Sequence, residues 1–238
     1  MLDFVAGEII GINKPYEWTS FDAVKRVRGA IQRRLNVKKF KVGHAGTLDP
    51  LATGVLIVCT GKATKEIDRL QAGTKEYIAE LTLGATTPSF DLEKEIDATY
   101  PYEHITEEMV REVLPRFTGH IMQVPPVFSA VKIDGKRAYK FARKGDEVEL
   151  KAKPLVIDEL EMLESELPKK LRLRIVCSKG TYIRALARDI GVALNSGAHL
   201  TALCRTRVGD IRLEDCVTPD QAVDLITHAP IVEPQAIR

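Results

Sequence analysis

The sequence lacks the patterns that mark membrane, secreted and disulfide-rich proteins. No apolar run approaches the roughly 20 residues that a membrane-spanning helix needs. The first residues, MLDFVAGEII, have no basic segment followed by a long apolar stretch, so a secretory signal is not expected and we expect a cytoplasmic protein. The four cysteines are widely and irregularly spaced. They form neither a CxxC pair nor a metal-ligand cluster with the histidines, which predicts buried free thiols.

Cofactor-binding patterns are missing as well. The sequence has no glycine fingerprint of a dinucleotide-binding fold, no phosphate-binding loop and no zinc-ligand spacing, and we therefore expect no cofactor and no metal. The formal net charge is only +2, which is too small to identify a nucleic-acid-binding protein by itself.

The distribution of charge is more informative than its sum. No acidic residue lies between Asp22 and Asp49. Eight basic residues fall in that interval: Lys25, Arg26, Arg28, Arg33, Arg34, Lys38, Lys39 and Lys41. Such a block creates positive potential that attracts phosphates, although the solvated face of a basic helix has the same composition.

The 238 residues, 45% of them apolar, suffice for a substantial core. No repeat and no Gly/Ser-rich or Pro-rich linker divides the chain, so a single domain over residues 1–238 is predicted. Helical spacing follows Thr19, Thr106 and Thr218 and recurs from Ile183 to Leu194, whereas strand patterns cover residues 55–59, 76–83 and 171–177. This alternation predicts an α/β or α+β fold.

Asp49 is the most conspicuous acidic residue, because glycines and small residues surround it in the segment GHAGTLDPLATGVL. Pro50 restricts Asp49 to extended conformations, and the apolar run after Gly54 predicts a buried strand. Gly43, Gly46 and Gly54 permit close approach of the backbone to a ligand. The carboxylate is thus predicted on a constrained turn at a sheet edge, where it serves either turn geometry or chemistry.

The segment GHAGTLDPLATGVL resembles the signature of the TruB family of tRNA pseudouridine synthases. Further family motifs follow the same order along the chain: NKPYEWTS, KEY, VPPVFSAVKIDGKRAYKFARKG, CSKGTYIRALARDIG and HLTALCRTRVG. The resemblance implies a largely antiparallel mixed sheet flanked by helices, with an RNA-binding cleft. It also implies conversion of uridine 55 in the T-arm loop of tRNA into pseudouridine, without a cofactor.

Three residues match the family's catalytic set. The resemblance implies that Asp49 is the nucleophile, that Tyr77 is the active-site tyrosine and that Arg184 pairs with the aspartate. A carboxylate suits covalent catalysis, a guanidinium keeps it ionised in a closed pocket, and a tyrosine can stack on the base and move a proton. Whether Asp49 attacks the sugar C1′ or the base C6 is left open by the sequence.

Substrate-binding residues are implied by the same resemblance. His44 is expected to enter the RNA loop where the flipped base was, and Lys14 to contact phosphate. Gly43, Thr47, Tyr182 and Leu200 are expected to line the substrate site. Residues 124–153 resemble the family's thumb, whose basic residues, Lys132, Lys136, Arg137, Arg143 and Lys144, would contact the tRNA backbone.

Two features depart from the family pattern. Asp91 lies in GATTPSFDLE, where many members have an acidic Thr-Asp-Thr type sequence, so its expected contact with the target loop is less secure. The segment after Val217 is too short for the PUA RNA-binding domain of longer bacterial relatives. We expect a monomer without an obligate protein partner, binding tRNA with reduced contacts to the acceptor end.

Three alternatives remain at this stage. The guide-RNA-directed catalytic subunits of archaea and eukaryotes have similar motifs, although they normally carry the PUA domain. A tRNA-folding chaperone would need the same binding residues without needing Asp49. A retaining glycosidase would use Asp49 with a second carboxylate about 5 Å away, which no neighbouring motif supplies.

Overall fold

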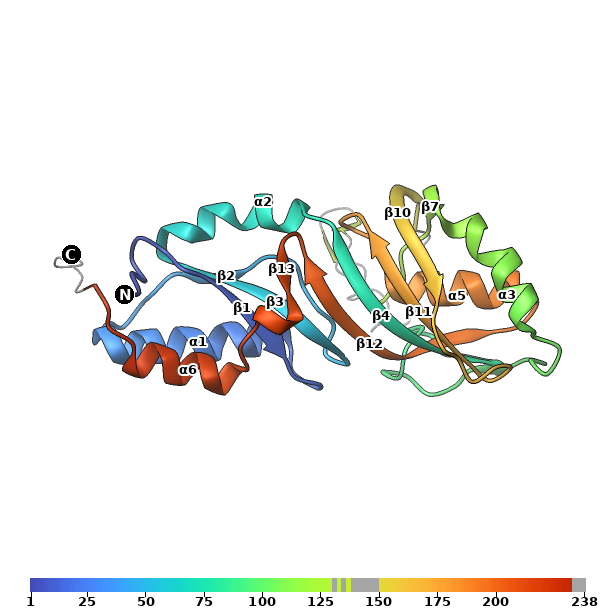
Figure 1. The fold of residues 1–238 in the computed structure, drawn as a ribbon, viewed down its shortest axis with the longest axis horizontal. Helices are drawn as coiled ribbons and strands as arrows, with labels where there is room; N and C mark the ends of the chain where they lie inside the picture. The colour runs from blue at the N-terminus through green and yellow to red at the C-terminus, as the bar shows by residue number, and fades with distance from the viewer. Residues whose placement is uncertain (130–131, 134–135, 138–149, 233–238) are drawn as a thin grey trace. The chain divides into compact units, whose positions relative to one another are not determined.

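The computed structural model describes residues 1–129, 132–133, 136–137 and 150–232. The chain forms two compact units. Unit 1 contains Met1–Glu76 and Cys204–Arg238, and unit 2 contains Tyr77–Leu203. Figure 1 shows the helices and strands of both units.

Unit 1 is built on a β-sheet with helices on both faces. Its strands are β1 (Ile9–Lys14), β2 (Val42–His44), β3 (Ala52–Thr60), the end of β12 (Ala198–Val208) and β13 (Ile211–Arg212). β3 pairs antiparallel with β1 and with β2, and it neighbours β12, which pairs antiparallel with β13. The helical segments are α1 (Ser20–Leu35), η1 (Gly61–Glu66), α2 (Ile67–Ala72), η3 (Leu213–Asp215) and α6 (Pro219–His228).

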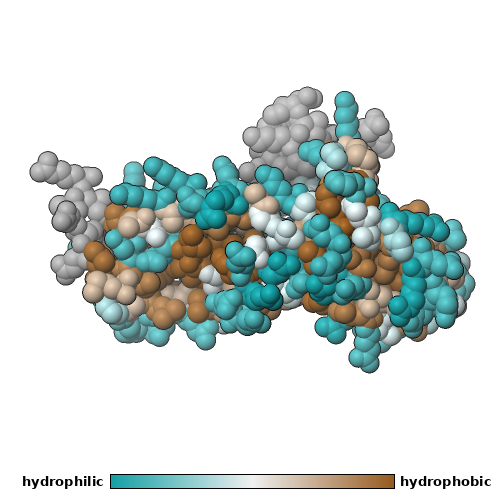
Figure 2. Space-filling model, turned by 45° about the horizontal axis from the view of Figure 1, so that its top comes forward, coloured by the Kyte–Doolittle hydropathy of each residue, from teal (hydrophilic) through white to brown (hydrophobic). Residues whose placement is uncertain are grey.

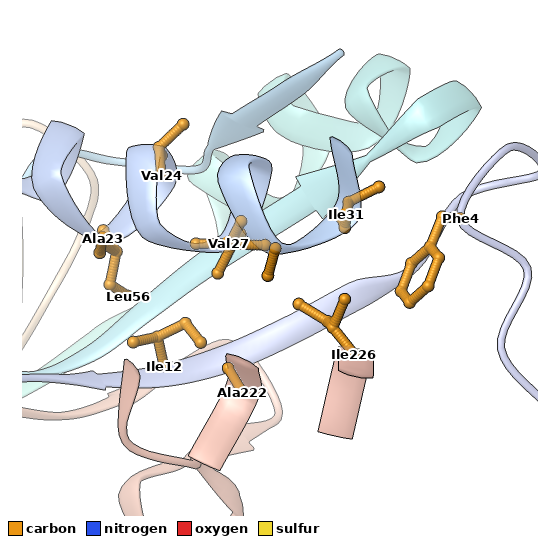
Figure 3. Packing of buried hydrophobic residues seen from close by; sticks show 11 residues of the cluster. Phe4, Ile12, Ala23, Val24, Val27, Ile31, Leu56, Ala222 and Ile226 are labelled. Atoms are coloured by element: carbon orange, nitrogen blue, oxygen red, sulfur yellow. The ribbon is translucent and has the colours of Figure 1, made fainter. Parts of the chain in front are cut away.

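The main core of unit 1 lies between this sheet and the pair α1 and α6. Val27 and Ile31 of α1 are fully buried against Ile12 of β1 and Leu56 of β3, and Ile226 of α6 joins them (Figure 3). The other face of β3 packs against Ile67 and Leu70 of α2. Alternate side chains of β3 thus enter different clusters, as the period of two in a strand requires.

The described residues of unit 2 form the remaining strands and the helices α3 and α5. Its strand order is β12, β4 (Lys75–Leu83), β11 (Lys170–Cys177), β10 (Lys153–Met162) and β7 (Gly119–Gln123). β10 pairs antiparallel with both neighbours. Two short hairpins, β5 (Ala85–Thr86) with β6 (Ala98–Thr99) and β8 (Lys132–Ile133) with β9 (Lys136–Arg137), are antiparallel as well. The helical segments are α3 (Glu107–Val113), η2 (Leu114–Phe117) and α5 (Ile183–Ala193).

The predicted mixed α/β class with a largely antiparallel sheet is confirmed. α1 begins after Thr19, whose side chain and that of Asp22 form the reciprocal capping box. The predicted strands lie within β3, β4 and β11, and every second side chain of β4 is buried. The helices predicted after Thr106 and Thr218 and from Ile183 are α3, α6 and α5.

The sequence patterns missed several strands, of which the longer ones are β1, β7, β10 and β12. The longest of these, β12, contains Arg205 and Arg207 among its apolar residues, so it has neither a continuous apolar run nor a regular alternation of polar and apolar residues. The segment 124–153 was predicted to be irregular, whereas β8 and β9 form a hairpin there and β10 begins at Lys153.

The surface carries scattered apolar side chains. Figure 2 shows one face, on which hydrophobic residues reach the surface between hydrophilic ones. In the described part of the chain, none of the helices combines the length and the apolar character needed to cross a membrane.

Neighbouring residues of α6 provide a test of the core of unit 1. Ile226 is 1% exposed, whereas Leu225 is 49% exposed. Ile226→Ala should lower the free energy of unfolding by about 2–5 kcal/mol, because it removes buried methyl groups and leaves a cavity. Leu225→Ala should change it by less than about 0.5 kcal/mol. Urea unfolding of both variants measures the difference, and similar losses would contradict this packing.

Candidate active site

Asp49 lies in unit 1 on the loop that connects β2 to β3. The amide of Ala52 donates to the carbonyl oxygen of Asp49 at 3.1 Å, which forms the predicted turn before β3. Leu48 is buried, and both its backbone groups bond to Ser20: the amide donates to Oγ at 2.8 Å, and the hydroxyl donates to the carbonyl at 3.0 Å. The carboxylate is half-buried. Sequence analysis missed Ser20, which lies at the first position of α1.

Lys14 holds the other side of this turn. Its ammonium is 0% exposed and donates to the carbonyl oxygens of Pro15, Trp18 and Pro50 at 2.9, 2.6 and 3.2 Å. Burial lowers the pKa of Lys14 to about 8, and the nearby carboxylate of Asp49 opposes this fall. All three donors of the ammonium are thus engaged by main-chain carbonyls in this structure, and the phosphate contact expected of Lys14 stays a prediction.

His44 and Gly43 lie on β2, immediately before the turn. His44 is half-buried, and its Nδ1 is buried without a hydrogen-bond partner among the described residues. Burial lowers the pKa of His44 below the ordinary value of 6.5, which disfavours the protonated ring. A Cβ at Gly43 would lie 2.8 Å from Cδ1 of Ile67, so here the missing side chain makes room for α2. Thr47 is exposed.

In unit 2, Arg184 is the centre of a buried polar cluster. Its Nε lies 3.7 Å from Oδ2 of Asp91, and both side chains are 7% exposed. Nη1 and Nη2 donate to the carbonyl oxygens of Ser89 and Phe128 at 3.2 and 3.0 Å. Asp91 also accepts a bond from the amide of Glu93. The carboxylate of Asp91 therefore faces Arg184 in the interior of unit 2.

The loop before α5 is fixed by a side chain that sequence analysis missed. Gln123, at the end of β7, is 2% exposed. It accepts a bond from the amide of Tyr182 at 2.9 Å and donates to the carbonyl of the same residue at 3.2 Å. This two-point contact orients Tyr182, the residue that caps α5. A buried glutamine leaves no periodic signal in a sequence, so only the fold revealed it.

Tyr77 and Leu200 are both buried in unit 2. Tyr77 is 8% exposed on β4, and Leu200 is 5% exposed on β12, where its amide donates to the carbonyl of Phe90. Beside Leu200, Nδ1 of His199 donates to the carbonyl oxygen of Ala85 at 3.0 Å, because a carbonyl oxygen can only accept.

The basic block forms the exposed side of α1 and the segment after it. Lys25, Arg26, Arg33 and Arg34 are exposed, and Arg28 lies 5.5 Å from the centre of the exposed Phe21 ring. Arg26 pairs with Asp220 of α6 at 2.7 Å. In the segment resembling the thumb, the backbones of Lys132, Lys136 and Arg137 belong to the β8–β9 hairpin. Arg143 and Lys144 lie outside the described residues.

The cysteines are free thiols, as predicted. Cys59 and Cys177 are buried, whereas Cys204 and Cys216 are only half-buried. Within the described ranges, no three His, Cys, Asp or Glu side chains lie close enough together to hold a metal ion.

Comparisons with known proteins agree with these features. Residues 32–183 match the model of the TruB family pseudouridylate synthase N-terminal domain, and residues 184–233 match the tRNA pseudouridylate synthase B C-terminal domain. The chain is 66% identical over 232 residues to tRNA pseudouridine synthase B of Phocaeicola vulgatus, covering 98% of each chain. It is 49% identical over 216 residues to the protein of that name from Flavobacterium johnsoniae, covering 90% of this chain and 94% of the relative.

A solved structure is similar in fold. A chain in the crystal structure of a Cbf5–Nop10–Gar1 complex superposes with a TM-score of 0.69 at 32% identity, covering 93% of this chain and 54% of that one. The match of the family model to more than half of the residues, with the identity over nearly the whole length, establishes the class. The chain belongs to the TruB family of pseudouridine synthases.

The burial of Lys14 predicts a specific dependence of stability on pH. Below pH 8 the lysine is protonated in both the folded and the unfolded chain. Between pH 8 and the ordinary pKa of 10.5, the unfolded chain retains a proton that the folded chain has released. The free energy of unfolding therefore gains a contribution that increases with pH over this window.

Lys14→Met removes this contribution, while the other titrating groups stay the same. The difference in unfolding free energy, wild type minus Lys14→Met, should increase between pH 8 and pH 10 in urea titrations. A difference that stays constant over this range would show that the pKa of Lys14 is not lowered.

Proposed function

We propose that the protein converts uridine 55 in the T-arm loop of tRNA into pseudouridine, with Asp49 as the nucleophile. The observation that carries this proposal is the position of Asp49, a half-buried residue on a turn. The residues before and after it, Leu48 and Pro50, each accept a hydrogen bond from a buried side chain. A nucleophile in covalent catalysis needs such a fixed geometry. The identity to proteins named tRNA pseudouridine synthase B favours tRNA as the substrate.

The reaction breaks the N1–C1′ bond of uridine, rotates the uracil and forms a C5–C1′ bond. The hydrogen on C5 is then lost as a proton and N1 takes up a proton, so that the product is an isomer of uridine. Asp49 holds the intermediate covalently, at C1′ or at C6. The target uridine must leave the RNA stack for this attack. The ring of His44, whose burial disfavours the protonated form, suits insertion into the space that the base vacates, because an uncharged ring costs less to place among stacked bases than an ion.

Arg184 and Tyr77 complete the proposed catalytic set. The guanidinium of Arg184 favours the ionised form of Asp49 if the two side chains meet in the complex with RNA. Its hydrogen bonds to Ser89 and Phe128 and its ion pair with Asp91 restrict the guanidinium to one orientation. Asp91 therefore helps to position Arg184. Tyr77 provides a ring for stacking on the uracil and a hydroxyl for proton transfer, and Tyr182 and Leu200 complete the uracil pocket.

The Asp49→Asn variant tests the proposed chemistry. A T-arm stem-loop labelled with tritium at C5 of its uridines should lose tritium to water in the presence of the wild type. Asp49→Asn should release it at least about 1000-fold more slowly, because an amide cannot form the covalent intermediate. The matched control is Asp210→Asn, which changes an exposed aspartate of unit 1 and should react at the wild-type rate.

The same experiment separates the alternatives. An RNA with cytidine in place of uridine 55 should release no tritium. Release from this RNA would show that a uridine at another position is modified. Normal binding without release by the wild type would favour the chaperone. Release that requires an added guide RNA would favour the guide-directed subunit.

We further propose that the exposed basic side chains of α1 contact tRNA phosphates. Lys25 and Arg33 are exposed, whereas Arg26 is engaged by Asp220. The double variant Lys25→Ala/Arg33→Ala should bind the T-arm RNA more weakly. Its slope of log K against log salt should be shallower by about 1–2, because each lost phosphate contact removes about 0.9.

The control for this prediction is Arg69→Ala on α2, which packs against the opposite face of β3 and pairs with Glu66. Its salt slope should equal that of the wild type. Equal slopes for the double variant and the wild type would show that α1 is a solvated face without RNA contacts.

A further inference from the structure

Arg205 of β12 is a buried cation that the proposed mechanism does not use. The residue is only 2% exposed. Its guanidinium donates from Nε to the carbonyl oxygen of Val55 at 2.8 Å, from Nη1 to Thr47 at 3.4 Å and from Nη2 to Gly46 at 3.2 Å. All three acceptors are main-chain oxygens, and two of them precede Asp49 on the same loop.

No salt bridge within the described ranges offsets the burial of this charge. None of the ion pairs among the described residues includes Arg205, and its positive charge contributes to the lowered pKa values of Lys14 and His44. Removing a cation from water costs several kcal/mol unless hydrogen bonds or opposite charges compensate. The three carbonyl bonds provide such compensation, and they join β12 to the Asp49 loop.

Gly54 explains how β12 comes close enough to make these bonds. Its φ is +101°, and a Cβ at this position would lie 2.2 Å from the carbonyl oxygen of Arg205 and 2.9 Å from its nitrogen. No other residue fits there without displacement of β12. The glycine expected to approach a ligand instead admits the backbone of Arg205, which links the motif around Asp49 to the HLTALCRTRVG motif.

Together with Ser20 and Lys14, Arg205 completes the hydrogen bonding of the loop. The carbonyl oxygens of Gly46 and Thr47 accept from Arg205, that of Leu48 from Ser20 and that of Pro50 from Lys14. The carbonyl of Asp49 accepts from the amide of Ala52. Every main-chain carbonyl from Gly46 to Pro50 is thus bonded, so the loop has few ways to change conformation.

We propose that Arg205 is a positioning residue for the nucleophile: it fixes the main chain at Gly46 and Thr47 and thereby sets where the carboxylate of Asp49 lies. This inference rests on the proposed role of Asp49. A displacement of about 1 Å in a reacting group can slow a reaction about 100-fold, so the loss of these bonds acts on the chemical step and leaves RNA affinity nearly unchanged.

Two variants of Arg205 test the proposal in the full-length protein. Arg205→Met removes the charge and all donors, and Arg205→Lys keeps the charge but replaces the planar fork by a compact ammonium that cannot reach three separate carbonyls in the same way. The matched control is Val27→Ala, which weakens the core of unit 1 without contact to the loop. All proteins are compared at a temperature at which circular dichroism shows each of them to be folded.

The first readout is single-turnover tritium release at saturating T-arm RNA, with the dissociation constant measured separately. Both Arg205 variants should slow release about 10- to 100-fold and change the dissociation constant less than about 3-fold. Val27→Ala should retain the wild-type rate. A folded Arg205→Met protein that reacts at the wild-type rate would overturn the proposal, and Arg205→Lys decides the question if Arg205→Met does not fold.

The second readout does not depend on catalysis. Hydrogen exchange of the peptide covering residues 44–51 should be faster in both Arg205 variants, since the amide of Leu48 loses its fixed position opposite Ser20. Unchanged exchange in this peptide would overturn the proposal even if activity fell. If the wild type releases no tritium while exchange still increases, the proposed function fails and the loop-fixing role of Arg205 stands.

Discussion

The candidate site depends on the hydrogen bonds that three buried side chains donate to the main chain around Asp49. A loop of glycines and small residues loses much conformational entropy when it is ordered, and favourable contacts must compensate for this loss. Lys14 from β1, Ser20 from α1 and Arg205 from β12 provide it, because each bonds to carbonyl oxygens of the segment 46–50. Two of these groups are cations, so the turn that carries the carboxylate also lies in a positive field. The same contacts therefore serve rigidity and electrostatics.

Unit 2 shows the same arrangement at two of its loops. Arg184 and Gln123 are buried, and each bonds to main-chain atoms of a neighbouring loop: Arg184 to Ser89 and Phe128, and Gln123 to both backbone groups of Tyr182. The ion pair with Asp91 balances the charge of Arg184, whereas Arg205 has only carbonyl partners among the described residues. In both units, a buried polar side chain from a regular element orders an irregular segment, which is the arrangement that a preorganised site requires.

Local signals in the sequence predicted those elements whose patterns are self-contained. The capping residues Thr19, Thr106 and Thr218 marked the starts of α1, α3 and α6, because a cap acts within one turn. The alternation in β4 and the apolar run in β3 marked strands whose faces are uniformly buried. β12 escaped notice because Arg205 lies in its interior, and a buried arginine breaks the expected pattern until its distant carbonyl partners are known.

The sequence by itself determined the fold class, the family that the motifs resemble, and the position of Asp49 on a turn before a buried strand. These depend on residue type and local spacing. Only the tertiary structure showed what the neighbouring motif residues contact: the buried ammonium of Lys14 bonds to the carbonyl of Pro50 in the turn, and Gly54 makes room for β12. The role of Arg205 was likewise decided there, since its partners lie about 150 residues away along the chain. Hydrogen bonds between residues so distant in sequence leave no trace in spacing or periodicity.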